Sequence, residues 1–230
     1  MTVSSTEALR VDVPDVGSVS AFLSLPPRPF ASLVLAHGAG AGMAHPFMAA
    51  VAAGLGERHM AVLRFQFPYM EQGMRRPDPP ARAQTAVRAA AAEAARRLPD
   101  LPLFAGGKSF GGRMTSQAQA AAALPGVRGL VFLGFPLHPA GRPSDDRATH
   151  LFDVHLPMLF LQGTRDALAR PDLMEPLVGR LGARATLHQF QEADHSFHVP
   201  ARTRRTDAAV RSELLDDATA WVRSVLARPA

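Results

Sequence analysis

The stretch that decides the fold is Gly106-Gly107-Lys108-Ser109-Phe110-Gly111-Gly112, which contains the pattern Gly-x-Ser-x-Gly. The pattern by itself is weak evidence, because glycine-rich chains meet it by chance. Here it follows the apolar residues 103–106 and opens the alanine-rich residues 109–124, which Pro125-Gly126 closes. A strand, a tight turn and a helix are the arrangement in which this pattern exposes a serine hydroxyl. The stretch therefore predicts Ser109 as a nucleophile on a strand-to-helix turn.

The glycines around this serine have a physical role in the turn. A serine that stands clear of a sheet needs a strained backbone, and only glycine at Gly107 and Gly111 lets the neighbouring chain pass without a Cβ clash. A helix that begins at Ser109 also points its N–H groups and its positive end at a reacting oxygen. The alternative is a phosphate-binding turn, but Lys108-Ser109 lacks the glycine spacing of a Walker motif.

Short apolar runs alternate with longer helical patterns along the rest of the chain. Runs typical of strands are residues 11–13, 18–25, 33–36, 61–67, 103–106, 130–135, 157–162 and 185–190. Patterns typical of helices are residues 45–58, 82–98, 109–124, 172–181 and 207–226. This alternation predicts an α/β fold with a mostly parallel sheet and helices on both faces. Residues 68–81 and 137–156 are expected to be irregular and to lie at the edge of the sheet where such folds place their sites.

Length and composition set limits on the class of protein. The 230 residues show no internal repeat and no linker, so we expect a single domain over residues 1–230, with its core at about 10–226. Apolar residues make up 47% and charged residues 20%, as in globular proteins. No run approaches the roughly 18 apolar residues of a membrane helix. The first residues lack the pattern of a secretory signal, so a cytoplasmic location without membrane attachment is the expectation.

The chain contains no cysteine, which excludes disulfides, thiolate metal sites and a cysteine nucleophile. We expect neither a metal nor a cofactor. The net charge is +5, but 24 of the 25 basic residues are arginines and only Lys108 is a lysine. The arginines are scattered, with no basic block, so the charge indicates a composition bias rather than nucleic-acid binding.

A serine hydroxyl becomes a good nucleophile when a histidine takes its proton and a carboxylate orients that histidine. With this motif the chain order is serine, acid, histidine. Asp166 fits the acid, because it follows the strand at 157–162 after a Gly163-Thr164 turn. Asp172 is the alternative, although its place favours a cap of the next helix. Asp153 precedes the strand and is expected at the opposite edge of the sheet.

His195 fits the base, because it follows the last strand in a loop that leads to the final helix. The turn-forming residue Asp194 directly before it supports this choice. His198, three residues on, is the alternative. His188 lies within the strand pattern and is interpreted as structural.

An oxyanion hole is expected after the strand at 33–36, in the glycine-rich run Gly38-Ala39-Gly40-Ala41-Gly42. The expected donors are the backbone N–H groups of Ala39 and of Phe110, with Gly40 as an alternative to Ala39. His37 is expected to brace this loop. A dinucleotide-binding loop is disfavoured, because the glycine spacing differs and the next strand ends on Arg64-Phe65-Gln66 without an acidic residue.

Together these motifs resemble the α/β-hydrolase superfamily, in its small dienelactone-hydrolase-like branch. The similarity is closer still to short predicted hydrolases related to the testis-expressed and NSL-complex proteins of animals. It spans about residues 10–225 and rests on AHGAG (36–40), RFQFPYM (64–70), GGKSFGG (106–112), GFPLHP (134–139), LQGTRD (161–166) and DHSF (194–197). The resemblance implies an eight-stranded hydrolase sheet and the triad Ser109, Asp166 and His195. Dienelactone hydrolase itself uses a cysteine nucleophile, so its substrate is not implied here.

The resulting expectation is a serine esterase or thioesterase that acts on a small-molecule substrate, as a monomer or homodimer. The alternatives are acyl transfer or perhydrolysis with the same triad, and an interaction module that kept the fold without activity. Residues 137–156 are too few for a helical cap domain. Apolar candidates for the pocket wall are Tyr69, Met70, Met74 and Leu137. Four arginines could attract an anionic substrate or be solvated surface residues: Arg75, Arg76, Arg142 and Arg147.

Overall fold

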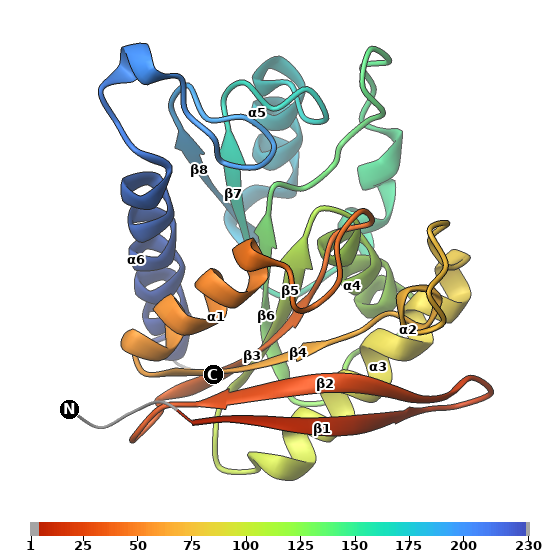
Figure 1. Ribbon diagram of the computed structural model, residues 1–230. Helices are drawn as coiled ribbons and strands as arrows, with labels where there is room; N and C mark the ends of the chain where they lie inside the picture. The colour runs from red at the N-terminus through yellow and green to blue at the C-terminus, as the bar shows by residue number, and fades with distance from the viewer. Residues whose placement is uncertain (1–4, 229–230) are drawn as a thin grey trace.

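The computed structural model describes residues 5–228. Its centre is one sheet of eight strands in the order β1-β2-β4-β3-β5-β6-β7-β8 (Figure 1). The strands are β1 Ser5–Val13, β2 Gly17–Leu25, β3 Ala31–Ala36, β4 Met60–Phe65, β5 Leu103–Lys108, β6 Val127–Leu133, β7 Met158–Gly163 and β8 Ala185–Phe190. The strands from β4 to β8 in this order run parallel, whereas β1 and β2 form an antiparallel hairpin and β2 pairs antiparallel with β4. The mostly parallel sheet that the sequence predicts is confirmed.

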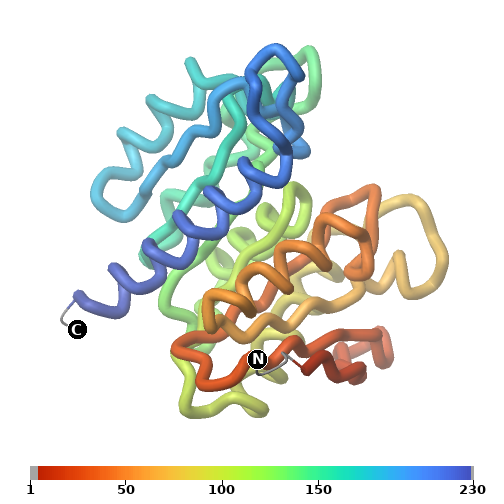
Figure 2. Tube along the Cα trace, turned by 60° about the vertical axis from the view of Figure 1, so that its left-hand side comes forward, coloured from red at the N-terminus to blue at the C-terminus, as the bar shows by residue number. Residues whose placement is uncertain are grey.

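Helices cover both faces of the sheet. The longer ones are α1 Pro46–Glu57, α3 Pro80–Arg97, α4 Phe110–Ala121, α5 Pro171–Leu181 and α6 Asp207–Leu226. Side chains of α1 and α6 pack on one face, and those of α3, α4 and α5 pack on the other. Figure 2 shows α1 and α6 side by side. The central strands β3, β4 and β7 are buried along their whole length, which is why they are continuous apolar runs rather than alternating ones.

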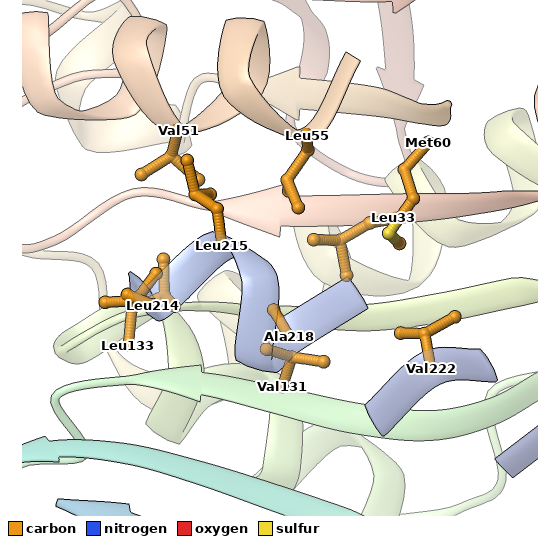
Figure 3. A pocket seen from close by; sticks show the side chains of 10 residues that line it. All are labelled: Leu33, Val51, Leu55, Met60, Val131, Leu133, Leu214, Leu215, Ala218 and Val222. Atoms are coloured by element: carbon orange, nitrogen blue, oxygen red, sulfur yellow. The ribbon is translucent and has the colours of Figure 1, made fainter. Parts of the chain in front are cut away.

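The layer between the sheet and the pair α1 and α6 is closely packed. It contains a small void of about 10 Å³ (Figure 3). The void is lined by apolar side chains only: Leu33, Val51, Leu55, Met60, Val131, Leu133, Leu214, Leu215, Ala218 and Val222. A space of this size holds at most one water molecule, and its wall offers no polar partner for one. This void therefore belongs to the hydrophobic core and is no ligand site.

Two segments that were expected to be irregular contain short helices. Residues 68–81 begin with α2 Pro68–Glu71, and residues 137–156 contain the 3₁₀ helix η1 Asp146–Asp153. Pro68 occupies the first position of α2, where its fixed φ suits a helix, and the buried Asp78 carboxylate accepts the Tyr69 N–H at 2.9 Å. Elements this short have no apolar periodicity, so the sequence pattern could not reveal them. Both segments lie after the carboxyl ends of strands, as expected.

Candidate active site

Ser109 forms the turn between β5 and α4, with φ +52° and ψ −115°. A non-glycine residue in this region carries about 1–3 kcal/mol of backbone strain. The end of β3 packs directly against the turn. An added Cβ would stand 2.4 Å from the Ala36 carbonyl oxygen at Gly107, and 2.5 Å from the same atom at Gly111. The predicted need for glycine at both positions is confirmed.

His195 lies between Ser109 and Asp166. The Ser109 hydroxyl donates to His195 Nε2 at 2.8 Å, and His195 Nδ1 donates to Asp166 Oδ2 at 2.7 Å. The Asp166 side chain is fully buried, while 24% of the His195 side chain is exposed. The three side chains follow β5, β7 and β8, so parallel strands deliver them to one edge of the sheet. In this arrangement His195 Nε2 can take the proton of the Ser109 hydroxyl while the Asp166 carboxylate fixes the imidazole ring.

The Asp166 carboxylate is itself held in place. Its Oδ1 accepts the Leu168 N–H at 2.8 Å, and its Oδ2 accepts the Gln162 side-chain amide at 2.5 Å. The Gln162 side-chain oxygen in turn accepts the Phe135 N–H at 2.9 Å. Gln162 therefore links the end of β6 to the acid. Sequence reasoning missed this residue, because a buried glutamine at the end of a strand has no recognisable signal.

The His195 loop, residues 191–198, is held by hydrogen bonds within the loop and by bonds from the segments beside it. Asp194 Oδ1 accepts the N–H groups of Ser196 and His198 at 2.7 and 3.0 Å, which confirms its predicted turn-forming role. The Arg165 N–H donates to the Ala193 carbonyl at 2.9 Å, and the Lys108 ammonium donates to the His195 carbonyl at 2.6 Å. The loop is thus bonded to the segments that carry the acid and the serine.

The alternative residues bond elsewhere. His198 is exposed and forms an ion pair with Asp207 of α6, and His188 forms a 3.0 Å ion pair on the surface. Asp172 lies in the first turn of α5, paired with Arg170 at 2.7 Å. The expectation that Asp172 caps α5 is wrong, because Arg170 occupies the cap position and binds the carboxylate instead.

The two backbone N–H groups expected to form the oxyanion hole have no acceptor among residues 5–228. Phe110 is the first residue of α4, so its N–H has no acceptor within the helix. Within residues 5–228, neither the Phe110 N–H nor the Ala39 N–H donates a hydrogen bond. Gly40, the alternative donor, is exposed. The structure thus leaves the N–H groups of residues 39 and 110 unused beside the serine turn.

His37 orients the N–H group of Ala39. Its Nε2 accepts the Phe67 N–H at 3.0 Å, so its Nδ1 carries the proton and donates to the Gly38 carbonyl at 2.8 Å. The Gly38 carbonyl and the Ala39 N–H belong to one planar trans peptide and point in opposite directions. Holding the carbonyl therefore directs the N–H of Ala39 to the other side. Burial lowers the pKa of His37 to about 4, so the ring is neutral at pH 7. The predicted bracing role is confirmed.

Strand β4 fixes the far end of the His37 loop, which comprises residues 37–45. Two side chains from one face of β4 and its extension bind the backbone of Met43. Arg64 donates to the Met43 carbonyl at 2.9 Å, and the Gln66 side-chain oxygen accepts the Met43 N–H at 2.8 Å. The sequence did not reveal either role, because the contacts join residues more than 20 positions apart.

The residues described here contain no group of three His, Cys, Asp or Glu side chains that could hold a metal ion. Over the same residues, none of the helices is both long and apolar enough to cross a membrane.

A family model described as an alpha/beta hydrolase domain matches residues 29–223. The match includes the serine turn, Asp166 and the His195 loop. The chain belongs to the α/β-hydrolases.

Solved structures with the same fold agree with this family. A serine hydrolase without a lid from Xanthomonas campestris is 24% identical, with a TM-score of 0.74 over 96% of this chain and 97% of that chain. A dienelactone hydrolase from Anabaena variabilis is 19% identical, with a TM-score of 0.76 over 96% and 98%. A serine hydrolase homologue from Coxiella burnetii is 18% identical, with a TM-score of 0.74 over 94% and 98%. The eight-stranded sheet implied by the resemblance is confirmed, and residues 137–156 hold no cap domain, as their small number predicted.

The proposed pocket residues of this α/β-hydrolase fall into two groups. Tyr69 and Leu137 have no exposed surface, so the expectation that they form the pocket wall is wrong. Tyr69 packs instead beneath the His37 loop, and its hydroxyl donates to the Ala39 carbonyl at 2.7 Å. Met70 is half-buried, and Met74 is 43% exposed, so both present surface that a substrate could contact.

The four arginines suggested for an anionic substrate also differ in exposure. Arg75, Arg76 and Arg142 are exposed, and Arg147 is half-buried. None of the four forms an ion pair within the described part of the chain. Their role in binding stays a prediction.

Proposed function

We propose that this α/β-hydrolase is a serine hydrolase that cleaves a carboxylic ester or thioester of a small substrate. The observation that carries the proposal is the pair of hydrogen bonds, 2.8 and 2.7 Å long, that joins Ser109 through His195 to the buried Asp166. A neutral imidazole in this position can take the proton of the hydroxyl, and the carboxylate stabilises the imidazolium that results.

The proposed reaction has two halves. Ser109 Oγ attacks the carbonyl carbon while His195 Nε2 takes its proton, and the N–H groups of Ala39 and Phe110 bind the oxyanion. The bond to the leaving oxygen or sulfur then breaks, and His195 returns the proton to the leaving group. In the second half His195 takes a proton from water, which attacks the acyl group on Ser109. As that intermediate collapses, His195 returns this proton to Ser109 Oγ, which releases the carboxylic acid and restores the serine hydroxyl.

Short acyl chains are the expected substrates. The connection from β6 to β7 holds only the 3₁₀ helix η1 between the two strands, which leaves no cap domain to enclose a long chain. The related protein from Xanthomonas campestris is likewise described as lacking a lid. A panel of p-nitrophenyl esters from acetyl to decanoyl, with matching thioesters, measures this preference.

A fluorophosphonate probe tests the nucleophile. We expect one adduct per chain, located on Ser109 by peptide mass spectrometry, and no labelling or ester hydrolysis by folded Ser109→Ala.

Comparing water, alcohol and peroxide as acceptors separates hydrolysis from acyl transfer and perhydrolysis. If well-folded wild-type protein neither reacts with the probe nor hydrolyses any ester of the panel, the proposal is wrong. Partner binding that is unchanged in Ser109→Ala would then support an interaction module.

A further inference from the structure

Lys108 is the single lysine in a chain with 24 arginines, and it directly precedes Ser109. It is the half-buried last residue of β5, and its ammonium lies against the His195 loop. Burial lowers the pKa of its ammonium to about 8, while the charges of Asp166 and Asp194 act in the opposite direction. A buried ammonium loses its hydration and is retained only where protein groups replace the water. The question is therefore which protein groups replace water around the Lys108 ammonium.

Three segments surround the Lys108 ammonium. It donates a 2.6 Å hydrogen bond to the His195 carbonyl, and it lies 5.8 Å from the centroid of the Phe197 ring. Gly134, after β6, is a further neighbour, where an added Cβ would stand 3.0 Å from Nζ and 3.4 Å from the His195 carbonyl oxygen. The ammonium thus occupies a space bounded by the ends of β5 and β6 and by the His195 loop.

The Lys108 ammonium donates to the backbone carbonyl of His195 and not to a carboxylate. Within residues 5–228, Lys108 forms no ion pair with an acidic side chain, although Asp166 and Asp194 are near enough to affect its pKa. Asp166 holds the imidazole ring of His195, whereas Lys108 holds the main chain of the same residue. Two independent contacts therefore set where the imidazole stands relative to Ser109.

We propose that Lys108 is a positioning residue, whose ammonium fixes the backbone of His195 at the distance from Ser109 that proton transfer requires. The inference rests on the proposed function and adds a residue to the machinery of that site. Because Lys108 and Ser109 are neighbours in the chain, the tether joins nucleophile and base through one peptide bond. A compact ammonium suits the space beside Gly134, whereas the planar guanidinium of arginine is wider and has a different geometry. Lys108 exchanges no proton with the substrate in this scheme.

Lys108→Met tests the tether, because methionine keeps much of the side-chain volume and removes the donor. We expect kcat for p-nitrophenyl acetate to fall about 10- to 100-fold while KM changes less than about twofold, since a misplaced base slows chemistry without removing binding contacts. The rate of fluorophosphonate labelling should fall by a similar factor. Ethylammonium added to Lys108→Ala should restore part of the lost kcat, which a general loss of packing would not allow.

Arg128→Met is the matched control. It removes one positive charge from an exposed residue near the start of β6, the end of the strand opposite the triad edge. We expect kcat within about twofold of wild type. An equal loss in Arg128→Met and Lys108→Met would show a bulk charge effect and overturn the tether. So would a folded Lys108→Met protein with wild-type kcat and labelling rate.

A measurement on the unaltered protein keeps the inference testable if Lys108 variants fail to fold. Labelling with ¹⁵Nζ-lysine gives one resonance, because the chain has one lysine. We expect it to differ from that of free lysine and to shift when the probe reacts with Ser109. A resonance at the free-lysine position, unmoved by the probe, would overturn the tether. Wild-type protein that is inert to probe and esters would instead refute the proposed function.

Discussion

His195 and His198 are three residues apart in one loop, yet their rings bond to different elements. His195 bridges Ser109 and Asp166, while His198 pairs with Asp207 on the surface. We expect His195→Ala to lower kcat for a short ester by about 10³-fold or more, because the hydroxyl loses its base. His198→Ala serves as the matched control and should keep kcat within about twofold of wild type, since an exposed ion pair contributes little. Steady-state kinetics of both variants decides which imidazole is the base.

Gly107 of the serine turn and Gly179 of α5 differ in what surrounds them. At Gly107 an added Cβ would meet three backbone atoms within 2.9 Å, whereas at Gly179 of α5 it would meet nothing within 4 Å. We expect Gly107→Ala to lower the free energy of unfolding by about 3 kcal/mol or more, because backbone cannot move aside. Gly179→Ala should raise it by about 0.5–1 kcal/mol, as for a glycine within a helix. Urea denaturation measures both, and equal effects would contradict the close approach.

The buried ring of His37 makes stability depend on pH. Its pKa is about 4 in the folded protein and 6.5 as the ordinary value, so the unfolded chain takes up a proton first as the pH falls. The contribution is fully present above pH 6.5 and is lost between pH 6.5 and 4. For one histidine it amounts to about 3 kcal/mol. Urea titrations at both pH values should show this loss in wild type and a smaller one in His37→Gln. Identical pH dependence in the two proteins would mean that the ring is not buried.

At the scale of elements, the segment from the end of β4 through α2 acts as a support for the His37 loop. Its contacts include the Arg64 and Gln66 bonds to Met43, the Phe67 N–H bond to His37 and the Tyr69 hydroxyl bond to the Ala39 carbonyl. The segment holds both ends of the loop that carries the Ala39 N–H. The oxyanion donor therefore depends on a strand and a helix that contain none of the three triad residues.

Removal of the Tyr69 hydroxyl tests this support. Tyr69→Phe keeps the buried ring and removes the hydroxyl that donates to the Ala39 carbonyl at 2.7 Å and, at 3.5 Å, to the Gly38 carbonyl. We expect kcat to fall about 10-fold with little change in KM, because a less fixed donor stabilises the oxyanion less well in the transition state. Ser224→Ala, which removes a hydroxyl from α6, is the control and should leave kcat unchanged. A wild-type kcat in Tyr69→Phe would mean that the loop holds its shape without this bond.

The sequence predicted the elements whose pattern is local. Continuous apolar runs marked the buried strands, and the stripe at residues 82–98 marked α3. It missed α2 and η1, since four to eight residues show no periodicity, and it placed Asp172 at a cap that Arg170 occupies. For the site, motif and strand order were enough to name the three residues that the structure brings together. Lys108, Gln162 and Arg64 could not be assigned roles, because their partners are far away in the chain or are backbone atoms.

For the whole molecule, the position of each strand in the sheet gives the parts of the site different local stabilities. The serine follows β5, which is paired on both sides, while the base follows β8, the last strand of the sheet. Most of β8 is half-buried, whereas β5 is buried until its last residue. Local opening favours strands with few buried contacts. The His195 loop should therefore separate from the site before the sheet unfolds.

Mild denaturation should consequently inactivate the protein before it unfolds. In an increasing urea series, we expect esterase activity to disappear at a lower concentration than the far-UV circular dichroism signal, with full recovery on dilution. Amide hydrogens of β8 should exchange before those of β5, read by mass spectrometry of peptides. Coincident loss of activity and of secondary structure would show that the edge strand opens only with the whole sheet. If activity is lost first, the fraying of one edge strand, rather than the melting of the core, sets the working temperature range of the protein.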